Sequence, residues 1–258
     1  MNCPCGGREQ TLTEFCVELA GLPIGVRALF PQTEEFCRDY LCRKEPLFTV
    51  ELSQELLDRE QAYNRETAEA EGREPFSVSP IYLEQLALYR QIAEVSPDHG
   101  VLLFHGSAVA VDGQVYLFTA KSGTGKSTHA RLWRRRFGDR ALMVNDDKPL
   151  LRFSEQGVLA CGTPWDGKHR LSTPISLPLK AVCLLTRARE NAIAPLSAGE
   201  AFPHLYQQCY HPTGAVQMSE TLTLLGQLCR QTRLYRLGCN MDPEAAEISY
   251  QGMQEENT

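Results

Sequence analysis

The pattern of apolar and polar positions changes near residue 100. Beyond that point, apolar runs of strand length alternate with segments in which apolar residues recur every three or four positions. The runs that predict buried strands are 101–105, 107–111, 114–120 and 141–145. Asp112-Gly113 favours a tight hairpin between the second and third runs. The spacing around Trp133 predicts a helix over 127–137, so a strand, a helix and a second strand follow one another as in a parallel crossover unit.

The C-terminal third continues this alternation. The turn 155–157 separates two apolar runs and predicts a second hairpin, and 180–186 has the composition of a further buried strand. A helical segment, the strand 233–237 and a helix opened by Asp242-Pro243 complete the order. The sequence therefore predicts an α/β fold.

The N-terminal part of the chain differs from the rest in composition and in its pattern of apolar positions. A start rich in glycine and proline leads to the β-like run 48–52, and the densely charged segment 54–75 predicts either a solvated helix or a mobile excursion. A serine N-cap and a first-turn proline then predict a helix over 79–95. We expect an accessory region over 1–78 and a compact domain over 79–258.

Composition and charge narrow the classes of function. At 258 residues, with 43% hydrophobic and 22% charged residues, the chain can bury a substantial apolar interior. The net charge of −6 and the pI of about 5.6 argue against a general binder of nucleic acid or anionic membranes. No apolar run approaches the ~20 residues of a membrane span, and the start lacks the pattern of a signal peptide. We expect a cytoplasmic protein.

The ten cysteines are spread along the chain without tight pairing, and Cys183 lies inside an apolar run. Reduced thiols that serve as small core residues are therefore expected rather than a disulfide framework. Cys3-Pro-Cys5 is too close for the usual spacing of two zinc ligands, and Cys209 with His211 has no partner residues at recognisable spacing. The sequence does not favour a structural metal site.

The segment 120–127, AKSGTGKS, carries the clearest chemistry. It matches the phosphate-loop pattern GxxxxGKS/T, except that Ala120 replaces the first glycine. It follows a predicted strand and opens a predicted helix, which is the context that a phosphate loop requires. The other interpretation is a Gly/Ser turn that happens to contain a lysine.

The phosphate loop predicts a binding site for ATP and Mg²⁺. Gly123 and Gly125 allow successive NH groups to point at phosphate oxygens, Lys126 can reach the β and γ phosphates, and the Ser127 hydroxyl can ligate magnesium. The residues expected to contact the nucleotide are Ser122, Gly123, Thr124, Gly125, Lys126, Ser127 and Thr128.

Two adjacent aspartates, Asp146 and Asp147, close the predicted strand 141–145. If the strands on either side of the helix run parallel, both end at the same edge of the sheet, and the aspartates lie beside the phosphate loop. One carboxylate could then hold the metal, and the other could accept the proton of an attacking hydroxyl. Paired aspartates after a strand are otherwise typical of a solvated turn.

SGTGKST, the paired aspartates and His105-Gly106 on an earlier strand together resemble the kinase domain of the HPr serine kinase/phosphorylases. That domain is similar in fold to ATP-dependent phosphoenolpyruvate carboxykinase, so the resemblance implies a mixed sheet with flanking helices around a phosphate loop.

The resemblance also implies roles for individual residues. It makes Asp146 the proton acceptor, Asp147 and Ser127 the magnesium ligands, and Lys126 the phosphate clamp. His105 would line the acceptor side, although a histidine at the end of an apolar strand is also typical of a satisfied core group.

The chain departs from this family in several places. Thr128 stands where the HPr kinases carry a glutamate, and their later glycine-rich signature is replaced by CGTPWDGKHR over 161–170. These departures put HPr in doubt as the substrate. The chain is also too short for a carboxykinase, and that enzyme's metal-binding lysine and histidine have no clear counterpart.

The segment 161–170 is a candidate loop for the acceptor or for gating the nucleotide. Trp165 could stack on a base or substrate, and Lys168 and His169 could meet phosphates, as could Arg170. The other interpretation is a Trp-anchored surface loop with solvated charges. The pair Arg187 and Arg189, after the strand 180–186, is a further candidate phosphate clamp.

Three hypotheses of function follow. The first is a kinase that transfers the γ-phosphoryl group of ATP to a hydroxyl, either a serine of a peptide or protein or a small molecule. The second is a module in which the nucleotide only orders a loop for a partner. The third is a nucleic-acid patch on the predicted helix, which the overall acidity disfavours; it would consist of Arg131, Arg134, Arg135 and Arg136. The sequence leaves the oligomeric state open.

Overall fold

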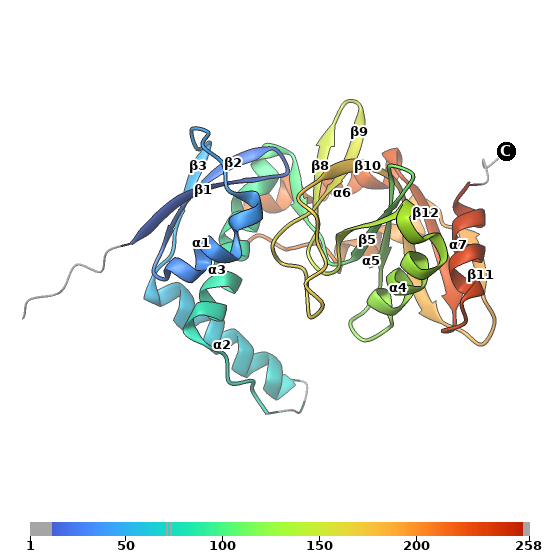
Figure 1. Cartoon of the computed structure of the whole chain (residues 1–258), viewed down its shortest axis with the longest axis horizontal. Helices are drawn as coiled ribbons and strands as arrows, with labels where there is room; N and C mark the ends of the chain where they lie inside the picture. Colours follow the sequence, from blue (N-terminus) through green and yellow to red (C-terminus); the bar gives the residue numbers. More distant parts are fainter. Residues whose placement is uncertain (1–11, 71, 73, 255–258) are drawn as a thin grey trace, which may run out of the picture. The chain divides into compact units, whose positions relative to one another are not determined.

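The computed structural model describes residues 12–70, 72 and 74–254 (Figure 1). By compactness the chain divides into two units, Met1–Ile92 and Ala93–Thr258. The boundary between the units falls inside helix α3 (Pro80–Val95). The functional division expected from the sequence, an accessory region over 1–78 and a second domain over 79–258, stays a prediction. Cys3-Pro-Cys5 lies outside the described residues.

Unit 1 contains a three-stranded sheet that the sequence patterns revealed only in part. Strand β1 (Thr13–Leu19) pairs antiparallel with β2 (Leu22–Ala28), and β2 pairs parallel with β3 (Phe48–Glu51). Ala20 and Gly21 join the first two strands with φ angles of 51° and 73°, the positive values that a two-residue hairpin turn needs. The run 48–52 was predicted, but β1 and β2 were missed; proline and glycine interrupt the apolar pattern of β2.

The helices of unit 1 include the charged segment of the chain. They are α1 (Pro31–Phe36), the short η1 (Arg38–Tyr40), α2 (Gln54–Ala70) and α3. Of the two alternatives for 54–75, the structure therefore shows the helix, over Gln54–Ala70. A partly buried ion pair, Glu60–Arg90 at 2.7 Å, joins α2 to α3. The buried Glu84 carboxylate accepts hydrogen bonds from the backbone NH groups of Leu29 and Phe30, just before α1.

Unit 2 is a mixed α/β structure built on a curled sheet. Among the described residues, this sheet has nine strands in the order β4-β8-β9-β10-β6-β5-β7, with β12 on β10 and β11 on β12. The strands are β4 (Val101–Leu103), β5 (Ser107–Val111), β6 (Gln114–Thr119), β7 (Ala141–Asn145), β8 (Leu150–Ser154), β9 (Gly157–Cys161), β10 (Ser176–Arg187), β11 (Ala192–Pro195) and β12 (Arg233–Cys239). Both predicted hairpins, β5–β6 and β8–β9, are present as antiparallel pairs.

Helices cover both faces of this sheet. The helical segments are η2 (Ser96–His99), α4 (Lys126–Phe137), η3 (Gly138–Arg140), α5 (Ala198–Tyr206), α6 (Ala215–Gln231) and α7 (Glu244–Gln254). One apolar cluster lies between the sheet and α5 and α6, and a second lies between the sheet and α4 and α7. Neighbouring positions of β6, such as Leu117 and Phe118, belong to opposite clusters, which explains why the strands read as continuous apolar runs.

Helices α4 and α7 lie side by side on one face (Figure 1). A buried polar cluster joins them: the Trp133 indole NH donates to the Ser249 hydroxyl at 2.9 Å, and His129 Nε2 lies 3.1 Å from the same oxygen. The His129 Nδ1 atom is buried and has no hydrogen-bond partner among the residues that the structure describes. Burial lowers the pKa of His129 to about 4, so the ring is neutral at pH 7.

The predicted crossover is present with one strand inserted. Strand β5 pairs antiparallel with both β6 and β7, so β6 and β7 point in the same direction without being neighbours. The neighbour of β6 on its other side is β10, which pairs with it in parallel. The C-terminal ends of β6, β7 and β10 therefore lie at one edge of the sheet, where the candidate residues follow.

Candidate functional site

The loop 120–125 joins β6 to α4 at this edge. Gly123 and Gly125 have φ angles of 78° and 128°, in the region that disfavours side chains. A Cβ atom on either glycine would meet nothing within 4 Å, so the backbone conformation and not crowding requires glycine here. Helix α4 begins at Lys126 without a side-chain cap on its first turn. Its first NH groups are therefore available to an anion at the helix N-terminus.

Two cations contact the loop through its carbonyl groups. The Arg187 guanidinium, at the end of β10, donates to the Gly123 oxygen at 2.6 Å and to the Thr124 oxygen at 3.3 Å. The Lys126 ammonium donates to the Ala120 oxygen at 3.1 Å. The Arg187 contacts hold the middle of the loop, and the Lys126 contact joins the start of α4 to the first residue of the loop.

Beyond β7, the turn 145–148 is organised by the buried Asn145 side chain. The Asn145 Oδ1 atom accepts from the backbone NH groups of Asp147 and Lys148 at 2.8 and 2.7 Å. Its amide group donates to the backbone and hydroxyl oxygens of Thr163, both at 3.0 Å. The same side chain thus fixes the turn that carries the aspartates and the start of the segment after β9.

The Asp146 side chain faces the loop and is 7% exposed. Its Oδ1 atom accepts a hydrogen bond of 2.7 Å from the Ser107 hydroxyl on β5. Burial raises the pKa of Asp146, while hydrogen bonds from Ser107 and Ser127 oppose that rise. The Ser127 hydroxyl, in the first turn of α4, is thus a direct neighbour of this carboxylate.

Asp147 lies between two cationic or titratable side chains. Its Oδ1 atom is 3.6 Å from His105 Nε2 and 3.8 Å from Lys148 Nζ. His105 Nδ1 is 3.0 Å from the side-chain oxygen of Gln208. Burial, together with the charges of Lys148 and Lys126, lowers the pKa of His105 to about 4, so the imidazole is neutral at pH 7.

Lys126 completes the group. Burial lowers the pKa of its ammonium group, and the charges of Asp147 and Asp146 act in the opposite direction. Both aspartates are therefore within electrostatic reach of the lysine that opens α4. The structure brings together Lys126, Ser127, Asp146, Asp147 and His105, from three separate segments of the chain.

The segment 161–172 borders the same group. Gly162 has no room for a side chain, because a Cβ atom there would lie 1.9 Å from the Thr173 oxygen. Gly167 has a φ angle of 73°, and its Cβ position lies 3.3 Å from Asp147 Cβ. The Asp166 carboxylate accepts from the Ser172 hydroxyl at 3.2 Å.

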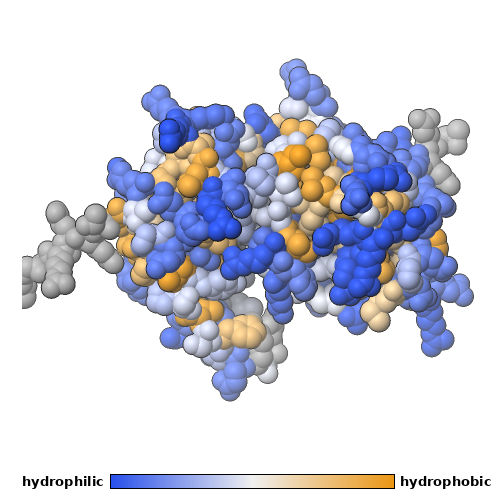
Figure 2. Space-filling view, viewed as in Figure 1, coloured by the Kyte–Doolittle hydropathy of each residue, from blue (hydrophilic) through white to orange (hydrophobic). Residues whose placement is uncertain are grey.

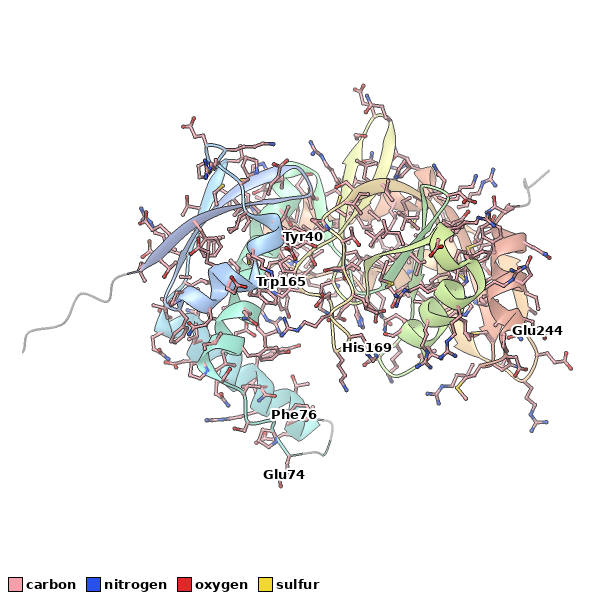
Figure 3. The ribbon with its side chains drawn as sticks, in the orientation of Figure 1. Tyr40, Glu74, Phe76, Trp165, His169 and Glu244 are labelled. Atoms are coloured by element: carbon pink, nitrogen blue, oxygen red, sulfur yellow. The ribbon has the colours of Figure 1, made fainter. Side chains whose placement is uncertain are left out.

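The predicted contact residues of this segment have different environments. Trp165 is only 7% exposed, whereas Lys168, His169 and Arg170 are exposed. Figure 3 shows Trp165 among other side chains and His169 farther out on the same segment. The charge of His169 acts on Asp146 and lowers its pKa, so His169 lies near the aspartates although it is exposed.

Several residues at the site were not found in the sequence. Ser107 and Gln208 contact Asp146 and His105 from segments that no motif marks. Asn145 could have been recognised, since an asparagine at the start of a turn commonly accepts from the NH groups two and three residues on. The predicted phosphate clamp Arg187 is bonded to the carbonyl groups of the loop, and its neighbour Arg189 is exposed.

The outer face of α4 is strongly polar. Arg131, Arg134, Arg135 and Arg136 are exposed, and Figure 2 shows hydrophilic residues over this part of the visible face. Arg136 pairs with Glu247 of α7 at 2.7 Å.

None of the helices in the described part of the chain is long and apolar enough to cross a bilayer. All eight cysteines in that part are free thiols.

The fold and the site define a mixed α/β protein with a glycine-rich loop and two aspartates at one edge of a curled sheet. Residues 79–222 match the family model described as "SynChlorMet cassette protein ScmC". Because the match spans more than half of the chain, the protein belongs to this family.

Other comparisons add little. No curated protein sequence matches the chain. The solved structure of the HPr(Ser) kinase/phosphatase from Coxiella burnetii is similar over 47% of this chain and 93% of that chain, with 12% identity and a TM-score of 0.29. A similarity of this size carries no conclusion about activity.

Proposed function

We propose that the protein is an ATP-dependent phosphotransferase that transfers the γ-phosphoryl group to a hydroxyl. The observation that carries the proposal is the contact of Asp146 with the Ser127 hydroxyl, since it joins the end of β7 to the first turn of α4. A glycine-rich loop with a lysine and a serine, placed beside two carboxylates, is the arrangement that phosphoryl transfer needs.

The loop would bind the phosphates of ATP. The NH groups at the start of α4 and the Lys126 ammonium supply positive charge at the position of the β and γ phosphates. Arg187 would keep the loop curved before the nucleotide arrives, because it holds the carbonyl groups of Gly123 and Thr124. Most of the rate enhancement would come from alignment and charge neutralisation.

The site also fits Mg²⁺. Ser127 offers a hydroxyl, and Asp146 and Asp147 offer carboxylates, which are the oxygen donors that magnesium prefers. In the proposed assignment Ser127 and Asp147 are the ligands. When bound, the ion would neutralise charge on the phosphoryl oxygens.

Asp146 would accept the proton of the attacking hydroxyl. Its pKa is raised by burial, which makes the carboxylate a better base than an exposed aspartate. The neutral His105 would line the acceptor side, with its Nε2 atom directed at Asp147. The exposed Lys168 and His169 would meet an anionic part of either substrate. The acceptor is the serine of a peptide or protein, or a small molecule.

Substitution of Lys126 tests the proposal. Lys126→Ala should lower phosphoryl transfer from γ-labelled ATP to fractions of a cytosolic extract by at least about a hundredfold, because the substitution removes the partly buried ammonium group at the phosphates. Arg135→Ala, on the exposed face of α4, is the control and should leave transfer unchanged. Equal transfer by wild type and Lys126→Ala would refute the proposal.

Asp146→Asn separates chemistry from binding. It keeps the size of the side chain, so nucleotide binding by calorimetry should persist while transfer is lost. The exposed Asp139→Asn is the matched control. If the wild type binds ATP without labelling any acceptor, the nucleotide only orders a binding surface. If Asp146→Asn transfers normally, Asp146 is not the proton acceptor.

A further inference from the structure

Unit 1 contains a pair of cysteines that the proposed function does not use. Val17 of β1 forms an antiparallel bridge with Leu41, so Cys16 and Cys42 are opposite each other in the same register. The Cys42 NH donates to the Cys16 carbonyl oxygen at 2.9 Å. Directly opposite residues in such a pair have Cα atoms about 5.5 Å apart, within the range that a disulfide spans.

The two sulfur atoms are already in contact. Cys16 Sγ lies 3.2 Å from Cys42 Sγ. Each thiol is partly exposed, and the neighbours of Cys42, Leu41 and Arg43, are exposed on both sides. A soluble oxidant can therefore reach this pair.

The other described cysteines lack either the partial exposure of this pair or its sulfur–sulfur contact. Most of them are buried, and burial raises their thiol pKa; they are Cys37, Cys161, Cys183, Cys209 and Cys229. Cys239 is partly exposed, but no sulfur–sulfur contact like that of Cys16 and Cys42 is found for it in the described part of the chain. Cys239 therefore serves as a control: its thiol is partly exposed but is not paired with a second thiol among the described residues.

The pair has an internal order of reactivity. Burial and the hydrogen bond to Cys42 raise the pKa of Cys16 to about 11. Because this raised pKa keeps the Cys16 thiol protonated, we assign the first attack to Cys42.

We propose that Cys16 and Cys42 are a redox-active pair that forms a reversible disulfide with a thiol–disulfide oxidant such as oxidised glutathione. The Cys42 thiolate attacks one sulfur of the oxidant, forming a mixed disulfide and releasing one glutathione thiolate. The Cys16 thiol then loses its proton to solvent and attacks Cys42 Sγ. This forms the Cys16–Cys42 bond and releases the second glutathione, so two thiols are oxidised and one disulfide is reduced.

The bond would close a loop that contains β2 and α1. It would tie the segment after η1 to the outer edge of β1, where Leu41 already bridges Val17. The oxidised form therefore restrains the sheet of unit 1. The proposal does not depend on the function of the site in unit 2.

Peptide mapping of the full-length wild type tests the pairing. Trypsin cuts after Arg8, Arg27, Arg38 and Arg43. Cys3 and Cys5 share the peptide 1–8, whereas Cys16, Cys37 and Cys42 fall into the separate peptides 9–27, 28–38 and 39–43. After equilibration with graded ratios of oxidised and reduced glutathione, non-reducing mass spectrometry should recover 9–27 joined to 39–43. The cross-link should disappear when the ratio is reversed. Failure to recover it at any ratio would overturn the proposal.

Variants test the order of attack. Cys16→Ser should accumulate glutathione on Cys42, because the resolving thiol is gone, whereas Cys42→Ser should acquire much less adduct on Cys16. Cys239→Ser should form the same cross-link as the wild type. Equal adducts on the two single variants, with circular dichroism confirming that both are folded, would refute the assigned order.

Discussion

His129 allows a prediction in which the structure sets both the direction and the size of the effect. The side chain is 2% exposed between α4 and α7, and burial lowers its pKa from 6.5 to about 4. The folded protein therefore resists protonation of this ring, whereas the unfolded chain binds the proton readily. Replacing His129 with glutamine removes the titrating group and keeps a polar side chain at the position.

The sign and size follow from proton linkage. Because the folded pKa is the lower one, the contribution of His129 to stability is fully present above pH 6.5 and is lost as the pH falls toward 4. Between about pH 7.5 and pH 5, the loss for one such histidine is about 2 kcal/mol of unfolding free energy. His105 shifts in the same direction, to about 4, and should add a loss of similar order.

Urea denaturation at the two pH values measures the effect. The difference in unfolding free energy between pH 7.5 and pH 5 should be about 2 kcal/mol smaller in His129→Gln than in the wild type. His204→Gln, at an exposed position, should keep the wild-type difference. A destabilisation that is the same at both pH values cancels, since the unfolding free energy of each variant at pH 5 is compared with that of the same variant at pH 7.5. The reasoning fails if His129→Gln keeps the full dependence on pH.

Two further substitutions test the loop and the segment beside it. Arg187→Ala should weaken ATP binding in calorimetry about tenfold, because two hydrogen bonds that hold the loop are lost, while Arg189→Ala should bind normally; equal affinities would show that the tether is dispensable. Gly162→Ala should lower the unfolding free energy by about 3 kcal/mol or more, since its Cβ would collide with the Thr173 oxygen. Gly199→Ala, with open space, should change it by less than about 1 kcal/mol, and similar losses in both variants would contradict the steric argument.

The sequence predicted the elements around the loop because their signals are local. The apolar runs of β5, β6 and β7 are nearly continuous, and the hairpin dipeptide Asp112-Gly113 and the glycines of the loop mark the boundaries between elements. The helix after the loop was predicted from the spacing around Trp133, which is completely buried. Direction followed from the crossover rule, and β6 and β7 do point the same way.

The order in which the strands pair across the sheet was harder to predict from the sequence. No local pattern indicates that β5 lies between β6 and β7, or that β6 pairs with a strand some sixty residues later along the chain. Ser107 and Gln208 were not predicted as site residues, because only tertiary packing brings them to the site and no local pattern marks them. In unit 1, Pro23 and Gly25 interrupt the apolar pattern of β2, so the first hairpin was missed.

Trp165 shows a different limit of sequence patterns. The sequence left two roles open for Trp165, a stacking contact with substrate or an anchor for a surface loop with solvated charges; the chain buries Trp165 and exposes Lys168 and His169. Large aromatic side chains bury much apolar area, so a tryptophan in a loop commonly anchors that loop. A role of Trp165 in contacting substrate stays a prediction.

Strand β10 has a consequence for how this protein can be divided. Its first residues pair with β9, and its later residues lie between β6 and β12. A fragment that stops before Ser176 would leave β6, and with it the base of the glycine-rich loop, with an open edge that invites association with other chains. The glycine-rich loop and the C-terminal strands therefore have to stay together in any fragment that is expressed or engineered.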